Sequence, residues 1–193
     1  MQCALVPPQQ EANQLCSDPF KLLLIAENAD TTVQGSHPVW TGDDQIVYKG
    51  CNLWAGGGIC GIFIVPSWIT GSQGSKGENP TKLAGVDGGS TTPTEAHGNS
   101  ILYQANETGN WEVYLTTTKG GSTNLSNNPA SDGMATFSPD GRSVAFVSNR
   151  DGNWAIWVIP TTSGQAKKLF NLPPNSWGVG ARDWTSERMS WGK

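Results

Sequence analysis

The chain has 193 residues, a formal net charge of −4 and only 15% charged residues. Its length suits a single domain with its own hydrophobic core. It contains no Lys/Arg-rich run and no apolar stretch near the ~20 residues of a membrane-spanning helix, which argues against nucleic-acid, anionic-membrane and transmembrane roles. The 24 Gly and 12 Pro predict many short strands joined by tight turns.

The first 34 residues contain two short apolar stretches, QCALVPPQQ and DPFKLLLIAE. They resemble CGIFIVPSW and NPTKLAG, which are the last two strands expected in the segment that follows. The first ten residues lack the basic start and the long apolar run of an intact signal peptide. We therefore expect residues 1–34 to supply half of a repeat unit.

Residues 35–86 form the first complete unit. One strand ends in HPVWTGDDQ, and a second and a third strand follow within QIVYKGCNLWAGGGICGIFIVPSW. The insertion ITGSQGSKGEN, which we expect on the surface, precedes a fourth strand in PTKLAG.

Two further units occupy residues 87–128 and 129–172. Their cores, SILYQANETGNWEVYLTTTKGGSTNLSN and SVAFVSNRDGNWAIWVIPTTSGQAKKLFN, align with an offset of 43 residues, from Tyr103 to Phe146. Each contains a strand, a turn with Gly-Asn-Trp, a second strand, a Gly turn and a short third strand. Tyr48 takes the matching place in the first unit. A four-stranded unit of about 40–55 residues is typical of a β-propeller blade.

Residues 173–193 end in ARDWTSERMSWGK, which matches only the first two strands of a unit. The half unit at 1–34 carries the complementary two strands. We therefore predict an all-β propeller of about four blades of four antiparallel strands, with the last blade closed by the N-terminal strands. Such closure removes exposed sheet edges, which invite aggregation. We also expect both faces of each blade to be buried between neighbouring blades.

The four cysteines are Cys3, Cys16, Cys51 and Cys60. The first two bracket a Pro/Gln-rich loop and the last two a Gly-rich turn, so local disulfides are favoured among the three pairings. Zinc is the alternative, although the chain lacks C-x-x-C knuckles and has only two His. Disulfides indicate an oxidising compartment, and hence a secreted, cell-surface or periplasmic protein.

The stretch ATFSPDGRSVAFVSNRDGNWAIWVIPTTSGQAKKL resembles the TolB-like β-propeller repeat. FSPDG at 137–141 and SNRDGN at 148–153 match most closely. The resemblance implies a propeller fold and a bacterial extracytoplasmic setting, but propellers host unrelated activities, so it does not assign one function. Related propellers commonly have six or more blades. A fragment of a longer protein, half of a two-chain ring and a four-blade unit therefore remain open.

Residues capable of catalysis or metal binding are sparse. His37 and His97 lie beside turns without a Ser or Cys partner in a known pattern, and we interpret them as exposed turn residues rather than general bases. Five aspartates lie at strand ends or turns: Asp43, Asp44, Asp140, Asp151 and Asp183. Turn capping is the favoured role, and calcium, which needs six to eight oxygen ligands, is the alternative. We predict no catalytic residue, no metal and no cofactor.

Tryptophans fall into two groups. Those in loops or just past strands are the candidate residues for stacking on sugars or anchoring a partner, namely Trp54, Trp68 and Trp177. The alternative for this group is packing against a disulfide or an adjoining blade. The aromatic residues that end first strands, Trp40, Phe137 and Trp184, are expected in the core.

These observations favour a non-enzymatic, extracytoplasmic scaffold that mediates protein–protein interaction or assembly. The terminal half-blades could pair within one chain or with the next chain, giving a monomeric ring or a larger assembly. A carbohydrate-binding, lectin-like propeller is the first alternative. A regulatory propeller from a larger secreted hydrolase or lyase is the second.

Overall fold

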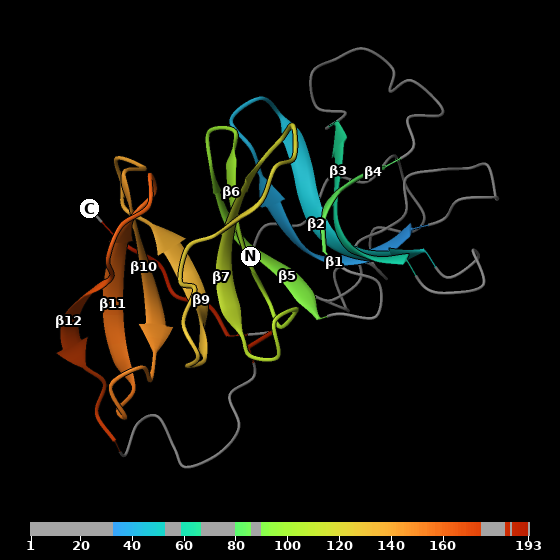
Figure 1. Ribbon diagram of the computed structural model, residues 1–193. Coiled ribbons are helices and arrows are strands. Elements are labelled where there is room, and N and C mark those ends of the chain that lie inside the picture. Colours follow the sequence, from blue (N-terminus) through green and yellow to red (C-terminus); the bar gives the residue numbers. More distant parts are fainter. Residues whose placement is uncertain are drawn as a thin grey trace, which may run out of the picture.

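The computed structural model describes residues 33–52, 59–66, 80–85, 90–174, 184–185 and 187–192. These residues form twelve strands in three four-stranded antiparallel sheets (Figure 1). They contain no helix long and apolar enough to cross a membrane. In each sheet, every strand pairs with the strand that follows it in the chain.

Sheet I contains β1 (Val33–Trp40), β2 (Gln45–Asn52), β3 (Ile59–Pro66) and β4 (Thr81–Ala84). Sheet II contains β5 (Thr91–His97), β6 (Ser100–Ala105), β7 (Glu112–Thr117) and β8 (Thr123–Asn124). Sheet III contains β9 (Asp132–Phe137), β10 (Ser143–Ser148), β11 (Ala155–Pro160) and β12 (Lys167–Asn171).

The second strand of each sheet is rich in β-branched and aromatic residues, which favour strands. In β10, Val144, Ala145, Phe146 and Val147 are all buried, although successive side chains point to opposite faces. Both faces of this strand are therefore covered, as the sequence predicts.

The first strand of each sheet carries a bulge. Pairing is irregular between Ser36 and Val39 in β1, between Pro93 and Glu95 in β5, and in β9 opposite Ala145 and Val147. In β9 the bulge includes Met134, whose φ of 53° is unusual for a bulky residue. A bulge frees backbone groups from the ladder, and the N–H of Met134 donates to Oε1 of Gln104 in sheet II, at 2.7 Å.

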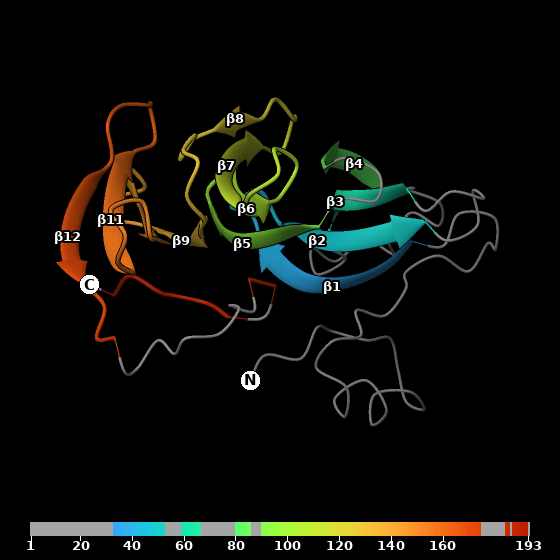
Figure 2. The same cartoon turned by 60° about the horizontal axis from the view of Figure 1, so that its bottom comes forward.

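The sheets lie side by side in chain order, with β1 beside β5 and β5 beside β9 (Figures 1 and 2). One apolar cluster joins sheets I and II, and its buried members are Val47, Ile62, Ile64, Ile101, Tyr103, Ala105 and Tyr114. A second cluster joins sheets II and III, and its buried members are Leu102, Val113, Leu125, Ala135, Phe137, Val144, Phe146 and Ile159. The core thus lies between the sheets.

The turns between first and second strands pack against one another from sheet to sheet. The N–H of Gly42 donates to the carbonyl oxygen of Gly98 at 2.8 Å. Gly141, with φ of +70°, lies under the ring of His97, where a Cβ would stand 2.4 Å from Cδ2. Glycine is therefore required at this turn for two reasons, backbone conformation and space.

The predicted fourth blade differs from what is observed. The described residues form three sheets, without a closed ring, and residues 184–185 and 187–192 contain no strand where two were expected. This segment contacts sheet III through side chains such as Trp184 and Met189 instead of pairing through its backbone. The strands predicted within residues 1–32 lie outside the described residues.

Candidate functional site

Consecutive sheets pack front to back, and both junctions use the same positions. We call the face turned toward the following sheet the back face. On sheet I this face carries the cross-strand pair Val47 and Ile64, which lies in the cluster shared with sheet II. On sheet II the matching pair is Leu102 and Leu115. Sheet III repeats the pattern with Ala145 and Val158.

Each sheet has a leucine in its fourth strand or directly after it. Leu83 packs against the cluster between sheets I and II. Leu125 is 6% exposed within the cluster between sheets II and III. Leu169 holds the matching place in the repeat, in LFNLP against LSNNP, yet it is 54% exposed.

Phe170, the next residue, is also exposed, at 56%. Sheet II has Ser126 at this position, which is buried and accepts a hydrogen bond from the N–H of Val113 at 2.8 Å. Full burial of a Leu or Phe side chain is worth about 1.5–3 kcal/mol. Two large apolar side chains on one short strand therefore provide a driving force for contact.

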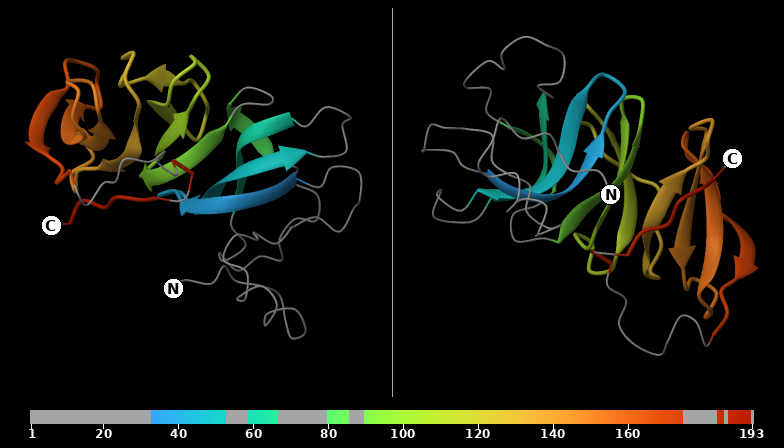
Figure 3. Two further views of the ribbon diagram at one scale, coloured as in Figure 1. Left: turned by 90° about the horizontal axis from the view of Figure 1, so that it is seen from below. Right: turned by 180° about the vertical axis from the view of Figure 1, so that it is seen from behind.

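The part of the back face nearest β9 is covered by the C-terminal segment (184–185 and 187–192), which crosses behind sheet III (Figure 3). Trp184 is 7% exposed, and its ring lies 6.3 Å from Trp111 and 5.5 Å from Trp154. Gly133 makes room for this ring, because a Cβ there would lie 2.5 Å from Cε3. Met189 packs against the same cluster.

The segment is also held to sheet II, since Nη2 of Arg188 donates to the carbonyl oxygen of Pro93 at 3.1 Å. Sheet III is thus covered near β9, and no other described element covers β12. We define the β12 surface as Leu169 and Phe170 of β12, which are exposed, and Val158 of β11, which is half-buried. Phe170 pairs with Ile156 and so shares the face of Val158, and Leu169 lies at the irregularity in the β11–β12 pairing. This surface is the candidate site.

Two lysines border the β12 surface. Lys168 forms an ion pair with Asp151, and this hydrogen bond lowers the pKa of the Asp151 carboxyl. Lys167 is exposed at the start of the same strand. The border is therefore polar, with the charge of Lys168 balanced within the sheet.

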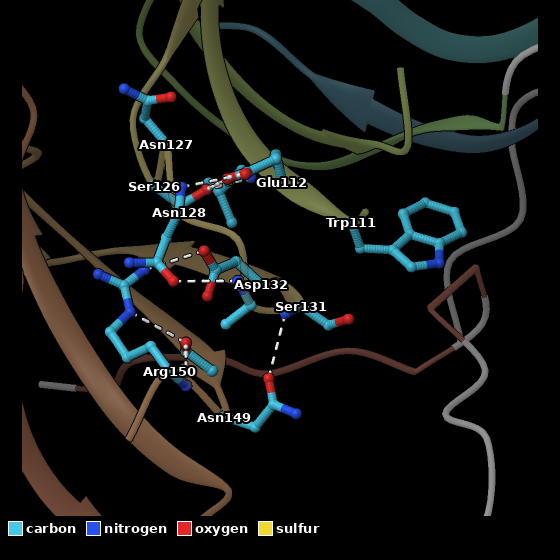
Figure 4. A network of polar contacts seen from close by, with 12 residues as sticks. Trp111, Glu112, Ser126, Asn127, Asn128, Ser131, Asp132, Asn149 and Arg150 are labelled. Atoms are coloured by element: carbon cyan, nitrogen blue, oxygen red, sulfur yellow. Dashed lines mark hydrogen bonds and ion pairs between the residues drawn. The ribbon is translucent and has the colours of Figure 1, made fainter. Parts of the chain in front are cut away.

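Buried polar groups gather elsewhere, at the connection between sheets II and III (Figure 4). Glu112 is 3% exposed and accepts hydrogen bonds from the hydroxyl of Ser126 and from the backbone N–H of Asn128, the latter at 3.0 Å. Nδ2 of Asn110 donates to the carbonyl oxygens of Asn128 (2.9 Å) and Ala130 (2.6 Å). These bonds fasten the connecting loop to sheet II.

Asp132 and Arg150 form a second part of the network. Nη2 of Arg150 lies 2.9 Å from Oδ2 of Asp132, and Nε donates to the Ser148 hydroxyl at 3.0 Å. The guanidinium is placed over the rings of Phe146 and Trp157, at 5.0 and 5.1 Å. Burial raises the pKa of Asp132, while Ser148 and Arg150 lower it by a smaller amount.

The carboxylates of Glu112 and Asp132 belong to a residue type that can act in catalysis or metal binding, but their contacts are structural. The Glu112 carboxylate accepts hydrogen bonds from the connecting loop and from Nδ2 of Asn110, and the Asp132 carboxylate bonds to Ser148 at the end of β10 and to Arg150. Within the described ranges, no three His, Cys, Asp or Glu side chains gather in a way that could hold a metal ion. We assign the network a structural role.

The predicted binding residues Trp54, Trp68 and Trp177 lie outside the described residues, as do Cys3 and Cys16. The register of β2 and β3 places Cys51 opposite Cys60.

Of the three aromatic residues expected in the core, two are buried and one is exposed. Phe137 and Trp184 are buried, as predicted, at 3% and 7% exposed. The prediction for Trp40 is wrong, since it is 43% exposed at the end of an edge strand.

Turn capping by aspartate is observed at Asp140. Its carboxylate accepts hydrogen bonds from the Ser138 hydroxyl at 2.6 Å and from the Arg142 N–H at 3.1 Å. These bonds lower the pKa of Asp140. His97, interpreted as a turn residue, is exposed, and its ring lies 5.7 Å from that of Phe137 in a tilted arrangement.

Sequence reasoning missed Leu169 and Phe170. A signal was present, because Phe170 stands where the preceding repeat has Ser126. Only comparison of the exposed fractions shows that Leu125 and Leu169 differ in environment.

The arrangement of three meander sheets is shared with solved structures. A structure assigned as TolB from Agrobacterium tumefaciens matches with a TM-score of 0.52 and 16% identity, covering 80% of this chain and 62% of that one. TolB from Acinetobacter baumannii matches with a TM-score of 0.53 and 13% identity, covering 74% of this chain and 41% of that one. The chain has a TolB-like β-propeller fold.

This likeness extends to the fold alone, because identity is low. The chain spans about three fifths and two fifths of the lengths of these two structures. No protein-family model and no curated protein sequence matches it. The function of this TolB-like chain must therefore be argued from its own surface.

Proposed function

We propose that the chain is a non-enzymatic scaffold that binds protein through the β12 surface. The observation that carries this is the contrast between Leu125, 6% exposed, and Leu169, 54% exposed, at one repeat position. Leu125 packs against sheet III, whereas the described residues form no further sheet that could pack against Leu169. Contiguous exposed apolar side chains bordered by polar groups are typical of protein-interaction sites.

We propose an extracytoplasmic location on the basis of the cysteines. Residues directly opposite in an antiparallel pair have Cα atoms about 4.5–5.5 Å apart, which lies within the range of about 4.4–6.8 Å that disulfides require. The register of Cys51 and Cys60 therefore supports a cross-strand disulfide. Cys3 with Cys16 remains a proposal from the sequence. Disulfides persist in oxidising compartments.

The scaffold function is tested with the double variant Leu169→Asp/Phe170→Asp and the matched control Thr123→Asp, an exposed site on β8. Binding of an apolar fluorescent dye is measured for each at a protein concentration low enough to keep the chains monomeric, and molar mass is measured by light scattering at higher concentration. We expect the double variant to lose dye binding while the control keeps it. Wild-type behaviour of the double variant in both assays would refute a role for the β12 surface.

Glycan binding is the second candidate, favoured by exposed aromatic residues. Trp40 and Trp191 are 43% and 38% exposed, and such rings stack on sugars. The loop residues Trp54, Trp68 and Trp177 remain proposed contributors. Titration with glycans, monitored by tryptophan fluorescence, should respond to Trp40→Ala or Trp177→Ala if this function holds.

A further inference from the structure

This inference rests on the proposed function and names the partner of the β12 surface. Between sheets I and II, the fourth strand of one sheet lies beside the third strand of the next, β4 beside β7. Leu125, at the end of β8, likewise shares a cluster with Trp157 and Ile159 of β11. The element that fits beside β12 is therefore the third strand of a further sheet.

The C-terminal segment covers the part of sheet III that lies next to β9, although its described residues contain no strand. Trp184 packs there in a cluster with Ala145 and Ile156, and its ring lies against Gly133 and Trp154. Phe137, its counterpart in the repeat, lies instead beside His97 at the other end of β9. The described residues therefore cover sheet III near β9 and include no third or fourth strand beside β12.

Residues 2–7 have the sequence of a third strand. QCALVP aligns with AIWVIP at 155–160 and with GIFIVP at 61–66, each ending in proline. In this alignment Ala4 and Val6 match Trp157 and Ile159, the residues of β11 that face sheet II. Residues i and i+2 of a strand point to one face, so Ala4 and Val6 would both face the β12 surface.

The strand at residues 2–7 could come from the same chain or from a second copy. The length of the linker between the N-terminal half-sheet and β1 distinguishes these two cases. Residues 18–27 are expected to form the fourth strand of the same half-sheet, leaving 28–32 before β1. The loops 85–90 and 125–131 are of similar length and connect neighbouring sheets. We therefore expect the half-sheet to lie beside sheet I. Sheets I and III lie at opposite ends of the array (Figures 1 and 2).

The back of sheet III is three sheet spacings from sheet I, or about 30 Å at ~10 Å per packed sheet. The linker from residue 27 to Val33 reaches about 20 Å when fully extended. For sheets stacked in an open row, a linker of this length is too short to bring the expected half-sheet to the β12 surface of its own chain.

We propose that residues 2–7 of a second copy of this chain bind beside β12, with Ala4 and Val6 against Leu169 and Phe170. The two surfaces differ, so the contact is head to tail. Each junction then brings the N-terminal strands of one copy beside β12 and the C-terminal segment of the other.

Two full-length variants test the proposal by complementation. The acceptor variant is Leu169→Asp/Phe170→Asp, and the donor variant is Ala4→Asp/Val6→Asp. We expect wild type to have a molar mass that is a multiple of 20.5 kDa, and each variant alone to be a monomer. Mixing the two restores one intact junction, so a 1:1 mixture should form a species of two chains. Circular dichroism checks that each variant is folded, and Thr123→Asp is the control that should assemble normally.

Either of two results would overturn the proposal. One is a wild-type protein that stays monomeric across concentration. The other is an assembling wild type whose two variants fail to associate when mixed. In both cases, loss of dye binding in the acceptor variant would still support the scaffold function, so the failures of the two proposals are distinguishable.

Discussion

Leu125 and Leu169 occupy the same position in consecutive sheets, but Leu125 is enclosed by the following sheet and Leu169 faces outward. Leu125 directly follows β8 and Leu169 lies within β12, so their local settings are alike. Their exposure differs because, within the described residues, a further sheet packs only against Leu125. Their contributions to folding should differ accordingly.

Leu125→Ala should destabilise the protein by about 2–4 kcal/mol, because it opens a cavity in the core. Leu169→Ala should change the free energy of unfolding by less than about 0.5 kcal/mol in the monomer, because the side chain is largely hydrated. Urea unfolding of both variants at low protein concentration measures the difference. Equal losses would mean that Leu169 is buried in solution.

Gly133→Ala should be destabilising because the new Cβ would meet Trp184. In a Trp184→Ala background the same substitution should cost less, since the ring is gone. Gln104 Oε1, 2.8 Å from that Cβ, will leave part of the cost. A double-mutant cycle measures the coupling, and additive effects would show that the C-terminal segment does not pack on β9.

Asn110→Ala should cost about 0.5–1.5 kcal/mol per lost hydrogen bond, because it removes the donor to two partly buried carbonyl oxygens of the connecting loop. Hydrogen exchange within residues 128–131 should become faster. The matched control is Asn153→Ala, which changes the equivalent but exposed residue of sheet III and should have little effect. Similar losses for both variants would contradict the role assigned to Asn110.

The pH dependence of stability should report the burial of Asp132. Its folded pKa is raised, so its contribution to stability is greatest below the unfolded pKa near 3.8 and declines as pH rises through the folded pKa. The stability of wild type relative to Asp132→Asn should therefore fall as the pH rises above about 4. A rise over this range would mean that pairing with Arg150 outweighs desolvation.

Reduction should affect sheet I if Cys51 and Cys60 are joined. Closing so short a loop is expected to stabilise the folded state by about 2–3 kcal/mol. Mass spectrometry of non-reduced peptides should recover the Cys51–Cys60 link. Recovery of both as free thiols after oxidative refolding would remove the argument for an oxidising compartment.

The sequence by itself determined the strands and turns of the three complete sheets and their order. Alternation in segments such as SVAFVS and turns such as Ser-Pro-Asp-Gly depend on residues close together in the chain, so the repeat could be aligned without a structure. The cross-strand position of Cys51 and Cys60 also follows from a local hairpin.

Only the tertiary structure decided which equivalent positions are covered. Trp40 and Phe137 align in sequence, yet Phe137 packs against sheet II and Trp40 is exposed. Leu125 and Leu169 differ in the same way. Local sequence specifies which face of a strand is apolar, but burial depends on whether another sheet packs against that face. That neighbour comes from a distant part of the chain or, as we propose for β12, from a second copy.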